Sequence, residues 1–192
     1  MKATPDLWHK YTADYEIVTV KDKKGRERKE ARYTGPWFCL MGSPGTVRTK
    51  LILAAVCGII LTGLLVAVQI FNHSSAWAVY VAVPQAVALF PLLYLLMGLM
   101  SLPYNLKPME RPGYMHGIIR VCRSLVAVMV LCGVSLTGDF IYRAVSKDWI
   151  YLPEDIWYLV LLAGILVLGG VILYLLYSIE IAERPNHAVR KE

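Results

Sequence analysis

The chain has 192 residues, 57% of them hydrophobic and 18% charged, with a formal net charge of +6 and a mean hydropathy of +0.50. From residue 51 to residue 106 there is no Asp, Glu, Lys or Arg, and 56 consecutive uncharged residues exclude an ordinary soluble domain of this size. Basic residues flank the apolar stretches, so membrane insertion explains the positive charge and no nucleic-acid partner is required.

Residues 1–50 form a basic segment ahead of the first apolar stretch, with eleven Lys or Arg against six Asp or Glu. The Thr-Pro-Asp sequence at residues 4–6 is typical of a helix start, because a capping residue is followed by proline and an acid. In such a helix Leu7, Trp8 and Tyr11 share one face. The sequence therefore predicts a short helix lying in the membrane interface.

A β-hairpin is predicted next, with strands at residues 15–20 and 30–34 around a polar turn at residues 22–25. A lone hairpin is marginally stable in water, so we expect it to dock on the helix ends, on lipid head groups or on another protein. Anionic lipid alone would attract it by about 1 kcal/mol per basic residue. The candidate residues for docking a partner or lipid are Lys21, Lys23, Lys24, Arg26, Arg28 and Lys29.

Four apolar stretches predict an all-α integral membrane protein with a bundle of four transmembrane helices. The helices are expected at about residues 51–71, 76–100, 118–142 and 156–179. They define a membrane domain of residues 51–181, with the basic segment 1–50 before it and a tail of residues 182–192 after it. A signal peptide is not expected, because the first apolar run begins behind 50 mostly polar residues.

The third predicted helix is the least regular, because only the 15 residues 124–138 are free of charge. These measure about 22 Å as a helix, whereas a bilayer needs ~20 residues. Charged residues must therefore occupy both ends of the span. Arg120 and Arg123 are expected to snorkel at one end, and Asp139 and Arg143 lie at the other.

The distribution of basic residues predicts that both chain ends are cytoplasmic, an N-in/C-in topology. With the N-terminus inside, 18 of the 20 Lys and Arg residues are cytoplasmic, and only Arg143 and Lys147 lie outside. Trp77, Trp149 and Trp157 then gather at the outer interface, where tryptophan is enriched. The compact loops and the lack of cysteines in the outer segments favour a plasma membrane location, in a bacterial inner membrane.

The second predicted helix contains the first candidate site. Pro84 and Pro91 each remove a helical hydrogen bond and are candidate hinges. Gln85 is a candidate binding residue, because it is polar and lies near mid-membrane, where transporters often place substrate. A structural kink with Gln85 hydrogen-bonded to a neighbouring helix is the favoured interpretation, since proline is ordinary in membrane helices.

The second candidate is the pair formed by Asp139 and Arg143 in the third predicted helix. Ionisable residues within a membrane are functional candidates by default. These two lie near a helix end, however, and an acid followed by a base four residues later stabilises a helix by itself. The structural interpretation is favoured, and Asp139 is the candidate if an ion or proton binds.

Other motifs do not meet the requirements of the chemistry they suggest. Lys50 lies five residues beyond Gly45, too far for a phosphate-binding loop. His116 and Cys122 are six residues apart, so on a helix their side chains diverge by about 240° and do not form a nucleophile–base pair. The remaining His and Cys residues show no metal or haem spacing. No catalytic residue, metal or cofactor is predicted.

Three classes of function compete on this basis. The favoured one is a non-catalytic membrane subunit or accessory scaffold of a larger complex, which docks another membrane or cytoplasmic protein through its cytoplasmic face. The alternative is a small transporter or channel with a polar site near the second and third helices. That alternative requires self-association, because four short helices enclose no path alone. A membrane enzyme is least favoured, because clustered nucleophiles, bases or metal ligands are not evident.

Overall fold

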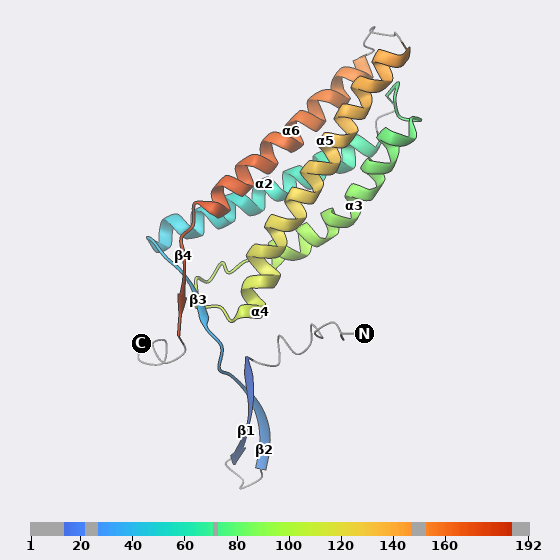
Figure 1. Ribbon diagram of the computed structural model, residues 1–192. Helices are drawn as coiled ribbons and strands as arrows, with labels where there is room; N and C mark the ends of the chain where they lie inside the picture. Colours follow the sequence, from blue (N-terminus) through green and yellow to red (C-terminus); the bar gives the residue numbers. More distant parts are fainter. Residues whose placement is uncertain (1–13, 22–26, 71–72, 147–152, 186–192) are drawn as a thin grey trace.

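The computed structural model is mostly helical, with four long apolar helices and a small β-hairpin near the N-terminus (Figure 1). The structure describes residues 14–21, 27–70, 73–146 and 153–185. The interfacial helix expected around residues 4–11 lies outside these ranges. The four helices are long and apolar enough to cross a membrane, so the predicted set of four is confirmed at that level.

Three of the long helices are continuous α-helices. Helix α2 spans Pro44–Ile70, α3 spans Val79–Met100 and α6 spans Pro153–Tyr177. Each is rich in Leu, Ile, Val and Ala and carries few charges. Such a sequence gives an apolar surface all round rather than on one stripe, which is typical of a helix that packs on one side and meets lipid on the other.

The third long helix, Arg111–Ser146, has 36 residues and combines three segments. These are α4 (Arg111–Tyr114), the π-helical turn η1 (Met115–Ile119) and α5 (Arg120–Ser146). At 1.5 Å per residue the combined helix measures about 54 Å, well above the ~30 Å of a hydrocarbon core. The helix therefore continues beyond its charge-free stretch at both ends.

The π-helical turn lies where the third long helix passes the end of α3. A Cβ atom on Gly117 would come within 2.8 Å of the backbone oxygen of Ser101. A Cβ atom on Gly98 of α3 would likewise lie 3.1 Å from the backbone nitrogen of Val121. Because glycine has no Cβ, these two positions allow the backbones to approach closely.

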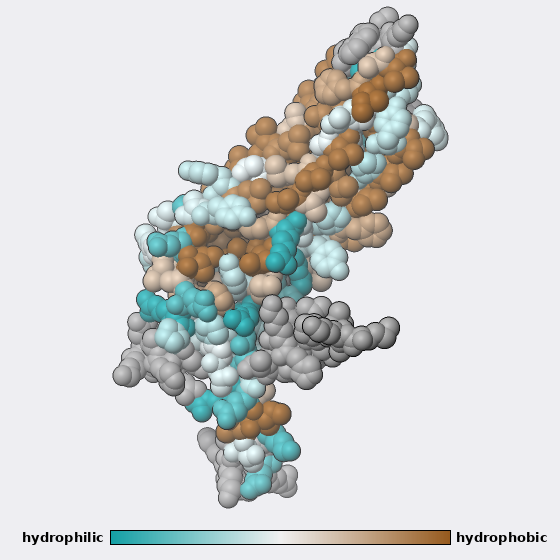
Figure 2. All heavy atoms as spheres, in the orientation of Figure 1, coloured by the Kyte–Doolittle hydropathy of each residue, from teal (hydrophilic) through white to brown (hydrophobic). Residues whose placement is uncertain are grey.

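The helices pack mainly as two antiparallel pairs, α3 with α5 and α2 with α6, and α5 also packs on α6 (Figure 1). Figure 2 shows apolar side chains over the bundle surface and hydrophilic ones gathered below it, around the strands. An apolar exterior together with an apolar interior is typical of a bundle surrounded by lipid. The interior is filled by fully buried side chains that include Leu51, Leu61, Leu65, Leu95, Leu125, Leu162 and Ile165.

The predicted hairpin is confirmed. Strands β1 (Tyr15–Lys21) and β2 (Glu27–Tyr33) pair antiparallel, with Tyr15 opposite Tyr33. Strand β2 begins at residue 27 rather than at the expected residue 30. The added residues are Glu, Arg and Lys, which have low intrinsic strand preference, and pairing with β1 overrides that preference.

A second two-stranded sheet was not predicted from the sequence. Strand β3 (Trp37–Leu40) pairs antiparallel with β4 (Ile181–Arg184). The other edge of β3 exchanges two hydrogen bonds with the loop before α4: Phe38 N–H donates to Met109 O at 2.8 Å, and Met109 N–H donates to Phe38 O at 2.9 Å. We call β3, β4 and Met109 the platform, and the end of the bundle that carries it the strand end.

The hairpin is tied to the loop and to the start of α4 by side chains at its base. The Tyr15 hydroxyl donates to Oε2 of Glu110 at 2.6 Å. Arg111 forms an ion pair with Asp14 at 3.1 Å, and its backbone N–H donates to the Tyr33 hydroxyl at 3.0 Å. Polar contacts thus connect the hairpin to the platform region, and the Tyr33 ring also packs edge to face on the Trp37 ring of β3, with centroids 5.4 Å apart.

The phenol of Tyr15 should titrate well above an ordinary tyrosine. The hydrogen bond to Glu110, then burial and the Glu110 charge, raise the pKa of Tyr15 from 10.0 to about 12. Because the pKa is higher in the folded state, the contact stabilises the docked hairpin fully below about pH 10, and that stabilisation is lost as the pH rises towards 12. Carbon NMR of protein labelled at the tyrosine Cζ atom measures this titration.

Replacing Glu110 supplies the control for the Tyr15 titration. Glu110→Gln removes the carboxylate, so the pKa of Tyr15 should fall back towards its ordinary value. Glu180→Gln removes an exposed acid at the strand end and should leave the pKa of Tyr15 unchanged. An ordinary tyrosine pKa for Tyr15 in the unsubstituted protein would show that the hairpin is not docked as described.

Candidate functional site

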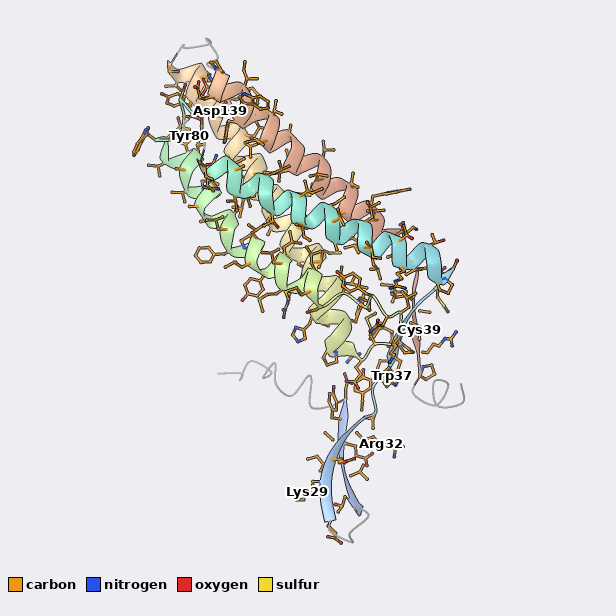
Figure 3. All side chains as sticks on the ribbon, turned by 180° about the vertical axis from the view of Figure 1, so that it is seen from behind. Lys29, Arg32, Trp37, Cys39, Tyr80 and Asp139 are labelled. Atoms are coloured by element: carbon orange, nitrogen blue, oxygen red, sulfur yellow. The ribbon has the colours of Figure 1, made fainter. Side chains whose placement is uncertain are left out.

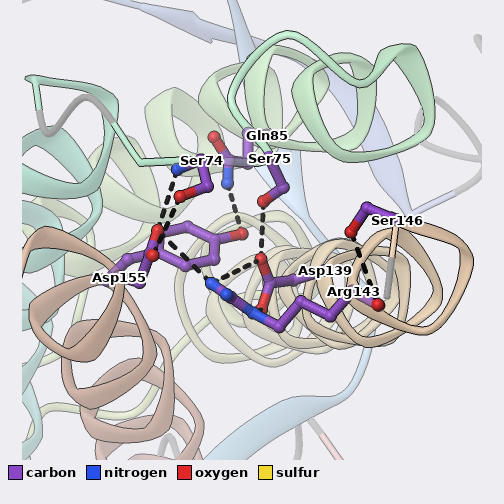
Figure 4. A network of polar contacts seen from close by, with 8 residues as sticks. Ser74, Ser75, Gln85, Asp139, Arg143, Ser146 and Asp155 are labelled. Carbon is purple, nitrogen blue, oxygen red and sulfur yellow. Dashed lines mark hydrogen bonds and ion pairs between the residues drawn. The ribbon is translucent and has the colours of Figure 1, made fainter. Parts of the chain in front are cut away.

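A cluster of polar side chains is buried at the end of the bundle opposite the strand end (Figure 4). It is built from the turn after α2, from α3, from the last turns of α5 and from the first turns of α6. Ser74 contacts it from the turn. The other members, each at most 6% exposed, are His73, Ser75, Gln85, Asp139, Arg143, Asp155 and Tyr158. We call these eight residues the buried polar network.

Asp139 joins α5 to the turn after α2. Its Oδ1 accepts a hydrogen bond of 2.6 Å from the Ser75 hydroxyl. Its Oδ2 accepts one of 3.0 Å from Nε of Arg143, one helical turn further along α5. The spacing of four residues places the carboxylate and the guanidinium on the same helix face, as expected from the sequence.

Asp155 adds a second carboxylate from the next helix. Its Oδ1 lies 3.3 Å from Nη2 of Arg143. The same oxygen accepts the backbone N–H of Ser74 at 2.8 Å, and Oδ2 accepts the Ser74 hydroxyl at 2.9 Å. Arg143 is thus shared between two carboxylates on different helices.

Two carboxylates and one guanidinium give these three residues a formal charge of −1. Asp155 lies in the first turn of α6, where the helix dipole is positive and favours an anion. The helix begins at Pro153, a residue suited to a first turn because its missing N–H would have no partner there. The helix end and the N–H of Ser74 together offset the excess negative charge.

Gln85 belongs to the inner part of the network. Its side-chain nitrogen donates to the Tyr158 hydroxyl at 2.6 Å, which joins α3 to α6. The Tyr158 ring is stacked on the ring of His73, with centroids 3.8 Å apart and planes 7° from parallel. Gln85 therefore has the partner on a neighbouring helix that the structural interpretation of the sequence required.

Pro84 and Pro91 lie within α3, which continues through both. Pro84 has no N–H, so it cannot form the usual helical bond to the carbonyl of Tyr80, four residues before it. The Ser135 hydroxyl on α5 donates to the carbonyl oxygen of the next residue, Val81, at 3.2 Å. This hydrogen bond joins α5 to α3 beside the proline.

The network connects parts of this chain to one another. Every carboxylate oxygen of Asp139 and Asp155 accepts at least one hydrogen bond from this chain. Within the described ranges, groups of three or more His, Cys, Asp or Glu arranged to hold a metal ion are not found. The geometry holds two negative charges and one positive charge together in the apolar interior and fixes three helices to one turn.

The structure brings together three residues predicted as site candidates, Gln85, Asp139 and Arg143, at one end of the bundle (Figure 4). His116 and Cys122 are not brought together, and they line two different cavities. This agrees with the divergence expected from their separation along the helix.

Asp155, Ser74, Ser75 and Tyr158 were not predicted as members of a site. Asp155 follows a proline and a glutamate at a helix start, which is an ordinary first-turn pattern. Its role depends on a partner in another helix, and such a pairing leaves no signal in local spacing. The sequence offers one signal for these residues. It is the acid–base pair near the end of a predicted membrane helix, because a buried ion pair requires further polar partners.

The basic residues predicted to dock a partner lie on the hairpin or beyond the described ranges. Lys29 is exposed on β2, towards the tip of the hairpin and away from the bundle (Figure 3). Lys21 is the last residue of β1, and Arg28 lies in β2. The other three fall outside the described residues: Lys23, Lys24 and Arg26.

No protein-family model matches the chain, and no curated protein or solved structure matches it either. A function for this chain is therefore inferred from its own residues.

Proposed function

We propose that the chain is a non-catalytic integral membrane protein that serves as a subunit or accessory scaffold of a larger membrane complex. The platform carries this proposal. It joins β3, β4 and Met109, three parts of the chain that are distant in sequence, and the hairpin projects from beside it (Figure 1). A recognition element held in a fixed position relative to a membrane bundle suits a scaffold.

An N-in/C-in arrangement in the plasma membrane is part of this proposal. Strand β3 directly precedes α2 and β4 directly follows α6, so their pairing places both flanking segments at one end of the bundle. Most of the basic residues belong to these segments and to the loop before α4. The positive-inside rule then favours a cytoplasmic strand end, and the compact connections favour a bacterial inner membrane.

The hairpin is the proposed docking surface. In the described part of the chain, β1 and β2 pair only with each other, and the Ile17 side chain on β1 is 71% exposed. An unpaired strand edge can accept an additional strand from another chain. Residues 15–33 carry seven basic and four acidic residues, so an acidic segment of a membrane or cytoplasmic protein is the favoured partner. Anionic lipid head groups compete for the same charges.

A homo-oligomeric transporter or channel is the less supported alternative. A conduction or substrate path needs polar groups that face a path between helices or between copies. Asp139, Arg143 and Gln85 instead contact partners within one chain and are almost fully buried. Their contacts favour a structural role for the network.

A photo-crosslinking residue placed at two exposed positions tests the proposal. We would substitute it at Ile17 on the hairpin and, separately, at Ile70, which is 78% exposed at the opposite end of the bundle. The tagged full chain is crosslinked in its native membrane, extracted in mild detergent and weighed by native mass spectrometry. The Ile17 probe should give one defined adduct with a second polypeptide, and the Ile70 probe should not.

Charge-reversed variants decide whether the hairpin itself is recognised. Lys29→Glu with Arg32→Glu reverses two exposed charges on β2 and should reduce the adduct several-fold (Figure 3). Arg48→Glu with Lys107→Glu makes the same change at exposed positions of the strand end outside the hairpin and should retain it. A discrete homo-oligomer with no second polypeptide would contradict the proposal and favour transport.

A further inference from the structure

A shallow basic cavity lies at the strand end, between α3 and the third long helix. Its volume is about 280 Å³, and its seven lining residues include Tyr94, His116, Arg120 and Arg123. None of the seven is acidic. The cavity thus presents two guanidinium groups and an imidazole to any molecule that enters it.

Two arginines of the cavity lie at the position along the helix where a membrane boundary is expected. Arg120 and Arg123 are the last charged residues before the uncharged stretch 124–138. His116, Arg120 and Arg123 are spaced by four and then three residues, so they follow one another along one helix face. In a membrane crossed by this helix, the cavity would therefore lie where the polar layer meets the hydrocarbon core.

Arg120 is held in the cavity by the rings of His116 and Tyr94. Its guanidinium donates to Nδ1 of His116, and its Cζ atom lies 6.0 Å from the centre of the Tyr94 ring. Among the described residues, the ion pairs found do not include Arg120 or Arg123. Neither charge is neutralised by a carboxylate of the described chain, and a guanidinium offers paired donors that match a phosphate group.

An apolar surface continues from the cavity along α5. The side chains of Val126 and Val130 are 46% and 59% exposed on α5. Val130 also begins an apolar groove of about 510 Å³ between α5 and α3 that includes Tyr80 and Val134. Val130 lies ten residues beyond Arg120, about 15 Å along the helix, which is half of a ~30 Å hydrocarbon core.

We propose that this cavity binds the head group of an anionic glycerophospholipid from the leaflet at the strand end. The guanidinium groups of Arg120 and Arg123 bind the phosphate oxygens, and one acyl chain lies along α5 towards the groove. A basic pocket between helices is suited to an anionic head group. The site is separate from the hairpin charges and does not depend on the proposed scaffold role.

Native mass spectrometry of the full chain, released from bilayer discs of mixed phosphatidylglycerol and phosphatidylcholine, tests this assignment. The unsubstituted protein should retain one phosphatidylglycerol in preference to phosphatidylcholine. Arg120→Gln with Arg123→Gln should weaken that binding roughly thirtyfold, at ~1 kcal/mol for each lost charge. Arg48→Gln with Lys107→Gln removes the same charge from exposed positions of the strand end and should leave it unchanged.

Three outcomes would overturn the proposal: equal retention of both lipids, retention by the double variant, or equal loss in the matched control. Displacement of the lipid by inorganic phosphate in solution would assign the cavity to free phosphate instead. Arg123→Gln alone serves if the double variant fails to fold, because Arg123 is exposed. It should weaken retention roughly fivefold.

Discussion

Replacing Arg143 by methionine should lower the free energy of unfolding by about 3–5 kcal/mol. Methionine has a similar length and no charge, so the substitution leaves the carboxylates of Asp139 and Asp155 buried without their shared counter-charge. Breaking a buried ion pair by removing one partner is far more costly than losing a surface pair. Denaturant unfolding of the detergent-solubilised protein, followed by circular dichroism, measures the loss.

Removing all three charges together distinguishes uncompensated charge from lost packing. The triple variant Asp139→Asn, Arg143→Met, Asp155→Asn should recover most of the stability lost in the single variant, because no charge remains buried. Arg48→Met, at an exposed position near the start of α2, should change the stability little. A loss below about 1 kcal/mol for Arg143→Met would mean that water reaches the network.

Gly117→Ala should lower the free energy of unfolding by about 1–3 kcal/mol, even though alanine is normally the better helix former. The added methyl group would lie 2.8 Å from the backbone oxygen of Ser101. A backbone atom cannot rotate away as a side chain can, so α3 and the π-helical turn must move apart. The same denaturant titration measures the effect.

Gly133→Ala is the matched substitution for Gly117→Ala. It places the same methyl group in the same long helix, at a position where, apart from the adjacent residues and the nearby backbone of its own helix, no described heavy atom lies within 4 Å of the new Cβ. This variant should be as stable as the unsubstituted protein or slightly more so, because no atom must shift and helix propensity improves. Equal destabilisation by both substitutions would show that the close approach at Ser101 is not the cause.

The parts of the fold that could be predicted are those with a long or periodic signal. The four apolar helices follow from runs of uncharged residues. The hairpin follows from two extended segments around a polar turn. The pairing of Asp139 with Arg143 follows from their spacing on one helix. In each case the partners are close in sequence or belong to one element.

The parts that could not be predicted depend on contacts between distant segments. Asp155 completes the charge cluster only because α6 packs on α5 at that point. The two four-residue strands of the platform are too short to show a period of two. Register between α3 and α6, which brings Gln85 to the Tyr158 hydroxyl, is a result of packing rather than of local sequence.

The platform can be completed only late in the synthesis of the protein. Strand β3 is synthesised before the first long helix, whereas its partner β4 is synthesised only after the last one. During synthesis β3 therefore has no β4 to pair with until α6 has returned the chain to the strand end. A completed β3–β4 pair therefore indicates a chain in which all four long helices have been made. A nascent or prematurely ended chain lacks this pair.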